Sequence, residues 1–357
     1  MEVPAPRKGT VHGSRLAAAI AVVGTAVIVA LFHGLRHDDA YITFRYARNL
    51  ATGVGYVFNP GEPVQGASSP LFTWLMAVVY LLLGDVVATA AVVVNAFAVG
   101  AQAWILYRML RDAAPYTAVA VAAFAVLDLF SSHFLLALET GTATALVLAT
   151  VWSLHAGRTR GCGLFLALAF LCRNDAALLV PVVVVVHAWR HRKLPWDTLL
   201  IAGTLVAPWL LFSQLYFGSV LPHTLGAKTG VSTFGEYLES YAWLFARAPG
   251  GPFLLVGVET VVVALLIAAG LRFVWRHARG LLPLVSYAIL LWLAYAVIGP
   301  PTSQHWHMQV PRTVAALLMV IGVLGTLERR AVATAWRPLR AAVPVLAAAY
   351  AVVLAHG

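Results

Sequence analysis

The chain has 357 residues, of which 61% are hydrophobic and 11% are charged, and its mean hydropathy is +0.84. Apolar runs at 16–34, 86–107 and 253–271 approach the roughly 20 residues that a helix needs to cross a bilayer, and long runs of this kind exclude a β-barrel. The formal charge of +10 comes from short basic clusters between such runs, which is typical of cytoplasmic loops. We therefore expect an integral membrane protein surrounded by lipid, with no nucleic-acid partner.

The hydropathy pattern predicts one all-α domain over residues 1–357, a polytopic bundle of about 11 transmembrane helices with no C-terminal soluble domain. The basic clusters place a polar first external loop, 35–84, on the non-cytoplasmic side. We expect juxtamembrane helices in it, because 70–83 is short for a span and begins with the helix-start pattern Ser-Ser-Pro. A second external loop, 218–250, should contain an interfacial helix at 232–247. The expected spans are 16–34, 86–107, 116–135, 141–156, 161–172, 176–189, 197–217, 253–273, 281–298, 311–327 and 339–355.

Five polar segments fall at the non-cytoplasmic ends of these spans, and we expect them to form one external cavity. The first contains Asp38 and Asp39, which are adjacent and therefore point in different directions. One of them can act as a general base toward a hydroxyl, or the pair can cap the helix that follows. Arg45 and Arg48 share one helix face, where they can bind a substrate anion or pair with Asp39 and Glu62.

Two inner segments and one loop carry further candidates. Glu139 stands at a turn between two spans, where it can contact substrate or cap the next helix. Arg173 can contact an anion or pair locally with Asp175. His223 and Lys228 lie in a loop that contains proline and glycine and no acid, which suits a lipid phosphate or another anion.

The last polar segment precedes the span expected at 311–327. His305 and His307 have the spacing of metal ligands, but without a firm third ligand they are a weak zinc signal, so we predict no metal there. Trp306 suits the membrane interface or stacking on a sugar. Arg312 should point into the external cavity, where it can bind phosphate. Asp128 falls inside an expected span, and the sequence offers no explanation for it.

Residues 38–62, DDAYITFRYARNLATGVGYVFNPGE, resemble the first external loop of GT-C glycosyltransferases, in particular the terminal arabinofuranosyltransferases of the mycobacterial cell wall. The likeness covers roughly residues 16–230. Gln65 stands where a glutamate is common in that family, and Asn174 replaces a usual proline. Three further segments are similar to family motifs in the same order, namely LET at 138–140, RND at 173–175 and LPHTLGAK at 221–228.

The resemblance implies a cell-wall glycosyltransferase with a GT-C-like bundle and an active site on the outer face of the cell membrane. Such an enzyme moves a sugar, here arabinofuranose among other options, from a polyprenyl-phosphate donor to a glycan, lipid or protein acceptor, with inversion. Asp39 matches the catalytic base best, and Asp38 is the supporting acid. Cations would stabilise the leaving phosphate, namely Lys228 and Arg312 with Arg173 or His223 nearby.

This chemistry requires no cofactor, although a divalent cation (Mg²⁺, Mn²⁺ or Ca²⁺) is compatible with Asp38 and Asp39 or with Glu139. A lipid or solute transporter or flippase is the main alternative, and it should place ionisable groups at mid-membrane or on both faces. A non-catalytic scaffold with the same fold is the second alternative.

Overall fold

The structure is a computed structural model that describes residues 8–131, 136–223, 229–233, 253–299 and 309–331. The described part is helical and contains no strand, as the sequence predicts. Its elements are α1 (Lys8–Phe32), α2 (Ala40–Ala51), α3 (Pro70–Leu83), α4 (Val87–Leu110), α5 (Pro115–Ser131), α6 (Thr140–His155), α7 (Thr159–Cys172), the 3-10 helix η2 (Asn174–Leu178), α8 (Leu179–His191), α9 (Trp196–Phe217), α12 (Phe253–His277), the 3-10 helix η3 (Arg279–Leu281), α13 (Leu282–Ile298) and α14 (Gln309–Ala331).

The described part of each expected span from the first to 311–327 is helical, and α2 and α3 occupy the stretch where juxtamembrane helices are expected. The span at 339–355 and most of the interfacial helix at 232–247 lie outside the described residues. Among those described, five helices are long and apolar enough to cross a membrane, and shorter apolar helices lie beside them. The five candidate spans are Gly13–Phe32, Val87–Leu110, Trp196–Phe217, Arg279–Ile298 and Gln309–Arg329.

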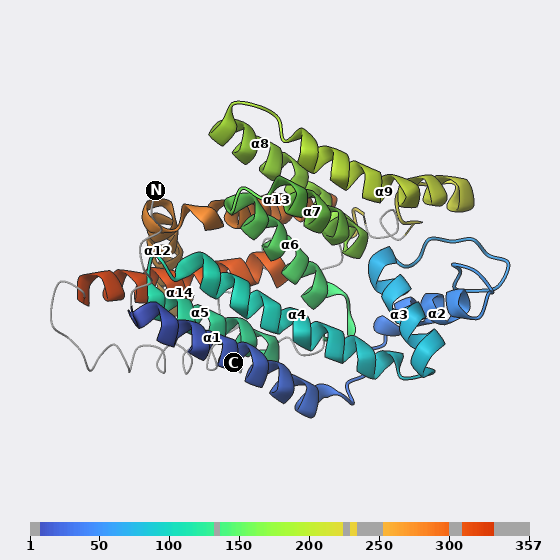
Figure 1. Cartoon of the computed structure of the whole chain (residues 1–357), viewed down its shortest axis with the longest axis horizontal. Helices are drawn as coiled ribbons and strands as arrows, with labels where there is room; N and C mark the ends of the chain where they lie inside the picture. Colours follow the sequence, from blue (N-terminus) through green and yellow to red (C-terminus); the bar gives the residue numbers. More distant parts are fainter. Residues whose placement is uncertain (1–7, 132–135, 224–228, 234–252, 300–308, 332–357) are drawn as a thin grey trace.

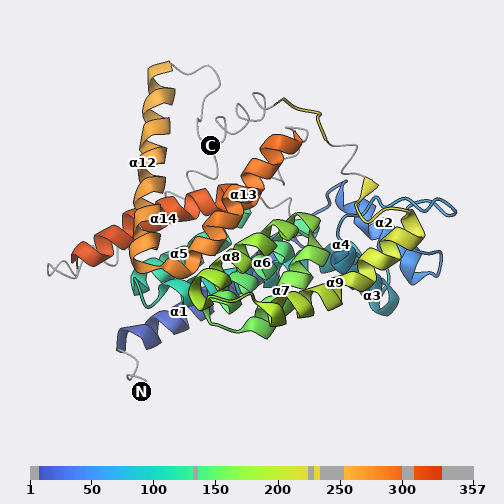
Figure 2. The same ribbon diagram turned by 90° about the horizontal axis from the view of Figure 1, so that it is seen from above.

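The helices form one elongated bundle (Figures 1 and 2). At its centre α4 packs against α1, α5 and α6, while α7 packs on α6 and α9 packs on α7. The helix α14 contacts α5, α12 and α13. The pair α2 and α3 lies at one end, against the beginning of α4 (Figure 1).

Proline and glycine set the ends of the elements around this pair. Pro70 occupies the first turn of α3, where a missing N–H costs nothing. Gly84 ends α3 with a φ of 74°, and Gly218 ends α9 with the same φ of 74°, a region that glycine adopts without strain. The chain therefore turns sharply at these points. Gly55 of the loop after α2 and Tyr216 near the end of α9 line the same groove.

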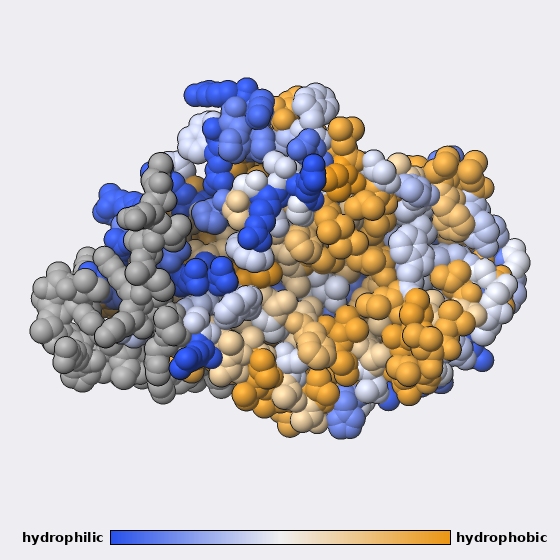
Figure 3. All heavy atoms as spheres, viewed as in Figure 1, coloured by the Kyte–Doolittle hydropathy of each residue, from blue (hydrophilic) through white to orange (hydrophobic). Residues whose placement is uncertain are grey.

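The surface is apolar over much of the face shown in Figure 3, especially in the middle and at the end with α2 and α3. Hydrophilic side chains gather on the same face around α8 and α12. On α9, Leu200, Leu211 and Leu215 are exposed, as expected of a helix that faces lipid rather than water.

Candidate functional site

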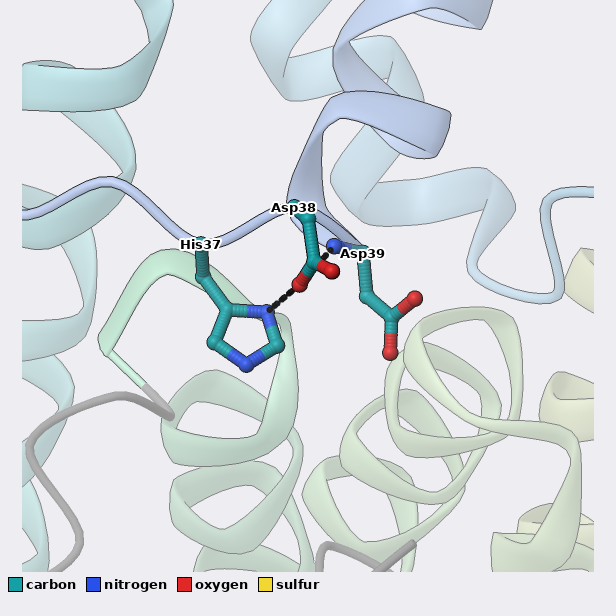
Figure 4. A group of neighbouring side chains, drawn as sticks. All are labelled: His37, Asp38 and Asp39. Carbon is teal, nitrogen blue, oxygen red and sulfur yellow. Dashed lines mark hydrogen bonds and ion pairs between the residues drawn. The ribbon is translucent and has the colours of Figure 1, made fainter.

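The acids of the first loop lie at the beginning of α2 (Figure 4). Asp39 occupies the N-cap position, but its side chain makes no capping hydrogen bond. Asp38 instead accepts the backbone N–H of Asp39 at 2.9 Å, and its carboxylate lies 3.4 Å from Nδ1 of His37. The Asp39 carboxylate points away from the other two side chains (Figure 4). Asp39 is thus half-buried at a helix N-terminus and available to a ligand.

These three side chains also form a candidate cation site. One ligand atom from each of His37, Asp38 and Asp39 lies within 4.8 Å of the others. Carboxylate oxygens with an imidazole suit several divalent cations. Such an ion would sit beside Asp39 and would compete with its role as a free base, so the two uses of this carboxylate are alternatives.

The rest of α2 is held to the loop that follows it. Nδ2 of Asn49 donates to the carbonyl oxygens of Val57 and Phe58 at 2.8 and 3.0 Å. Nε of Arg45 donates to the same Phe58 oxygen at 3.2 Å and its guanidinium lies over the Phe58 ring. Arg45 therefore shapes the loop, and neither it nor Arg48 forms an ion pair with a described residue.

Hydrogen bonds also hold Glu62 and the loop residues that follow it. Glu62 accepts a hydrogen bond from Asn59 at 3.0 Å and is exposed. The Tyr46 hydroxyl donates to the carbonyl oxygen of Val64 at 2.6 Å and accepts the N–H of Gly66 at 2.9 Å. Burial raises the pKa of Tyr46, so this hydroxyl keeps its proton and the loop keeps its anchor.

Gln65 lies between Val64 and Gly66 in the chain, and it links the first loop to the segment after α9. Its backbone N–H donates to Nδ1 of His223 at 3.2 Å. Because Nδ1 accepts this bond, only Nε2 of His223 is left to donate to a phosphate. The Gln65 side chain is 0% exposed, and neither of its amide atoms has a partner in the described chain.

A buried ionic cluster joins the end of α7, the beginning of α6 and the end of α13. Arg173 makes a two-atom hydrogen-bonded pair with Asp175 and lies 3.6 Å from Glu139. The hydroxyl of Tyr295 donates to Asp175 at 2.6 Å. Burial alone would lower the pKa of Arg173, but the charge of Asp175, together with Tyr295 and Glu139, has the larger effect. The pKa of Arg173 is therefore raised well above its usual value. Arg173 is therefore always charged, and it already pairs with two carboxylates.

Asn95 of α4 positions the segment that carries Glu139. Nδ2 of Asn95 donates to the carbonyl oxygens of Leu136 and Leu138, each at 2.8 Å. Its Oδ1 accepts the backbone N–H and the hydroxyl of Thr142 at 2.9 and 3.0 Å. Sequence reasoning missed Asn95, although a lone asparagine inside an apolar run is the signal that could have identified it.

Asp128 and Arg312 form a second polar junction, between α5 and α14. Their closest charged atoms are 3.9 Å apart, and Asp128 also accepts the Thr313 hydroxyl at 2.7 Å and Nε2 of Gln309 at 3.3 Å. Arg312 therefore begins α14 beside a carboxylate of its own chain. This pairing explains Asp128 and gives Arg312 a partner that the sequence did not indicate.

Thr140 connects this junction to the ionic cluster. It lines a cavity of about 50 Å³ together with Asp128 and Thr313, and it also lines a narrower space beside Arg173 and Asp175. Its hydroxyl is buried without a hydrogen-bond partner among the described residues. The cavity is lined mainly by apolar side chains, and its few polar groups can bind an ordered water.

An aromatic groove lies between the first loop, α3 and α9. Its volume is about 410 Å³ and its lining is almost entirely apolar. The rings of Tyr56, Trp209 and Phe212 lie 5.3 to 6.5 Å apart. The residues that line it are Leu50, Gly55, Tyr56, Trp74, Pro208, Trp209, Phe212 and Tyr216.

Contacts between neighbouring residues link some of the described candidate residues. Ala40, next to Asp39, and Leu138, next to Glu139, belong to the same buried apolar cluster. The hydrogen bond from Gln65 brings the residues after α9 to the first loop. Four predicted site residues lie outside the described residues, namely Lys228, His305, Trp306 and His307.

No protein-family model matches this chain, and a search of curated proteins finds no matching relative. The resemblance to GT-C glycosyltransferases therefore stays a prediction.

Proposed function

We propose that the protein is an integral membrane glycosyltransferase of the GT-C type, which transfers a sugar from a polyprenyl-phosphate donor to a hydroxyl acceptor. The observation that carries this proposal is the position of Asp39. It stands at the N-terminus of α2 without a capping bond, and its neighbour Ala40 shares a buried cluster with Leu138, the neighbour of Glu139.

The aromatic groove supports a lipid-linked donor. It lies where the loop after α2 meets α9, one of the candidate membrane spans. An apolar lining of this kind gains free energy by taking an isoprenoid chain out of water, at about 25 cal/mol per Å² of apolar surface. A chain that enters from the bilayer would pass Trp74 and Trp209. Its phosphate would then lie near the polar end of the bundle.

The transfer needs one proton acceptor and one means of stabilising an anion. Asp39 takes the proton from the acceptor hydroxyl, and the resulting oxygen attacks the anomeric carbon. The bond between that carbon and the phosphate oxygen breaks, so the polyprenyl phosphate leaves with both electrons and the configuration inverts. Lys228, Arg312 and His223 are the proposed partners of that phosphate.

The cluster around Arg173 has a different part in this proposal. Because its guanidinium is already engaged by Asp175 and Glu139, Arg173 orients these carboxylates more readily than it binds phosphate. Glu139 can then accept a hydrogen bond from a sugar hydroxyl. Arg45, Arg48 and Glu62 line the approach from the first loop, where an acceptor glycan or lipid would enter.

We further propose that this end of the bundle faces the non-cytoplasmic side, because the basic clusters lie between the opposite helix ends. The reaction requires no cofactor in this scheme. If a divalent cation is bound by His37, Asp38 and Asp39, a chelator should lower the rate of turnover. If Asp39 acts as a base without a cation, a chelator should leave that rate unchanged.

Purified protein in vesicles, offered a panel of radiolabelled polyprenyl-phosphate sugars and glycan acceptors, tests the proposal. We expect one donor to give a glycosylated product whose anomeric configuration is inverted. Movement of the intact lipid across the bilayer without a product would instead identify a flippase. Donor binding without turnover under all conditions would identify a scaffold.

A further inference from the structure

The last turn of α13 contacts two separate parts of the candidate site. On one side the Tyr295 hydroxyl donates to Asp175 at 2.6 Å and accepts from Arg173 at 3.4 Å. Four residues later, the carbonyl oxygen of Gly299 accepts the N–H groups of Val231 and Ser232 at 2.9 and 3.0 Å. The same turn therefore contacts the buried ionic cluster and the loop segment 229–233.

Gly299 is required by the geometry of the second contact. Its φ of 62° lies in the left-handed region that favours glycine. A Cβ added at this position would also collide with the carbonyl oxygen of Ser232. Any other residue would therefore strain the backbone of α13 and displace segment 229–233 at the same time.

Segment 229–233 follows in the chain the two residues proposed to bind phosphate. Gly230 follows Lys228 by two residues and His223 by seven. The described residues on either side of that stretch have partners, because His223 accepts the N–H of Gln65 and Gly230 donates to the carbonyl oxygen of Ile298 at 2.8 Å. The position of segment 229–233 relative to Arg173 is set through the last turn of α13.

We propose that Tyr295 and Gly299 are positioning residues of this site. Tyr295 sets the orientation of Asp175 and Arg173, and Gly299 sets the position of segment 229–233, which follows His223 in the chain. This inference depends on the proposed function, because it assigns to α13 the alignment of the carboxylates with a segment close in the chain to a proposed phosphate partner. The effect of each residue on the structure can be measured without substrate.

Four single variants separate positioning from stability. Tyr295→Phe removes only the hydroxyl, and its control is Tyr287→Phe, on the same helix, where the hydroxyl forms no hydrogen bond with a described residue. Gly299→Ala adds the colliding methyl group. Its control is Gly157→Ala, which has a similar φ of 69° and nothing within 4 Å of the added Cβ.

Hydrogen exchange on the full-length protein in detergent tests the structural part. We expect the amides of Gly230, Val231 and Ser232 to be protected in the wild type and in Gly157→Ala, and to exchange at least tenfold faster in Gly299→Ala, because their acceptors are displaced. Equal exchange in the two glycine variants would overturn the role of Gly299.

Kinetics with the polyprenyl-phosphate sugar that the wild type turns over tests the rest. We expect Gly299→Ala to raise the donor KM about tenfold, and Tyr295→Phe to lower kcat about tenfold with little change in KM, since small misplacements of reacting groups have effects of this size. Wild-type kinetics in Tyr295→Phe, or equal losses in Tyr287→Phe, would overturn its positioning role. A wild type that turns over no donor would instead contradict the proposed function, while the exchange result would still stand.

Discussion

Oδ1 of Asp128 lies 3.9 Å from the guanidinium of Arg312, and this pair joins the end of α5 to the beginning of α14. The side chains are 15% and 30% exposed, so solvent screens the pair only in part. Arg312 is the first cation of α14 and precedes Thr313, which lines a cavity together with Thr140 and Asp128. The pair thus holds a proposed phosphate ligand in place before substrate arrives.

A double-mutant cycle with Asp128→Asn and Arg312→Gln measures this coupling. We expect a coupling free energy of about 1 kcal/mol, between the values typical of exposed and buried ion pairs. The matched control is Asp112→Asn with Arg111→Gln, a neighbouring pair in which Asp112 is 84% exposed, and its coupling should be near zero. Thermal unfolding in detergent measures the stability of each variant. Equal coupling in both cycles would contradict the role given to Asp128.

Asn95→Ala should destabilise the protein strongly. The substitution leaves the carbonyl oxygens of Leu136 and Leu138 and the N–H of Thr142 without their partner inside the bundle. Each buried group left unsatisfied costs about 1 to 3 kcal/mol, so we expect a total loss of about 3 kcal/mol. Val94→Ala, one residue away on α4, should cost about 1 kcal/mol. Similar losses for the two variants in chemical unfolding would show that Asn95 does not hold this segment.

Phe212→Ala tests the lipid groove. Phe212 lines the groove and is 38% exposed, so its removal should leave the fold intact. We expect the KM for a long-chain donor to rise about fivefold, since roughly half of a phenylalanine side chain would lose its apolar contact. The KM for a donor with a short soluble chain should not change. Leu215→Ala, on the same helix but outside the groove and 77% exposed, is the control. Equal effects on both donors would exclude this groove as the chain site.

The helices could be predicted from the sequence because membrane spans depend on local composition. The apolar runs, Ser69-Pro70 and Gly84 are local signals, and the helices begin and end close to them. The pairing of Arg173 with Asp175 could also be predicted, because the two residues are only two positions apart in the chain.

The partners of these residues could not be predicted, because they come from distant parts of the chain. Tyr295 reaches Asp175 from 120 residues away, and Gln65 reaches His223 across 158 residues. A tyrosine near the end of an apolar helix looks like an interface residue in the sequence. Only the packing of α13 against η2 and α8 reveals its hydrogen bonds. Asp128 was unexplained for the same reason.

The most direct test of the account is the turnover of Asp39→Asn in vesicles with the polyprenyl-phosphate sugar that the wild type uses. Asparagine keeps the size of the side chain but cannot take a proton, so we expect kcat to fall by at least about 10²-fold while donor binding and thermal stability are unchanged. Asp85→Asn, an exposed acid in the turn after α3, should retain wild-type kcat. Wild-type turnover by Asp39→Asn would contradict the central claim that this carboxylate is the base.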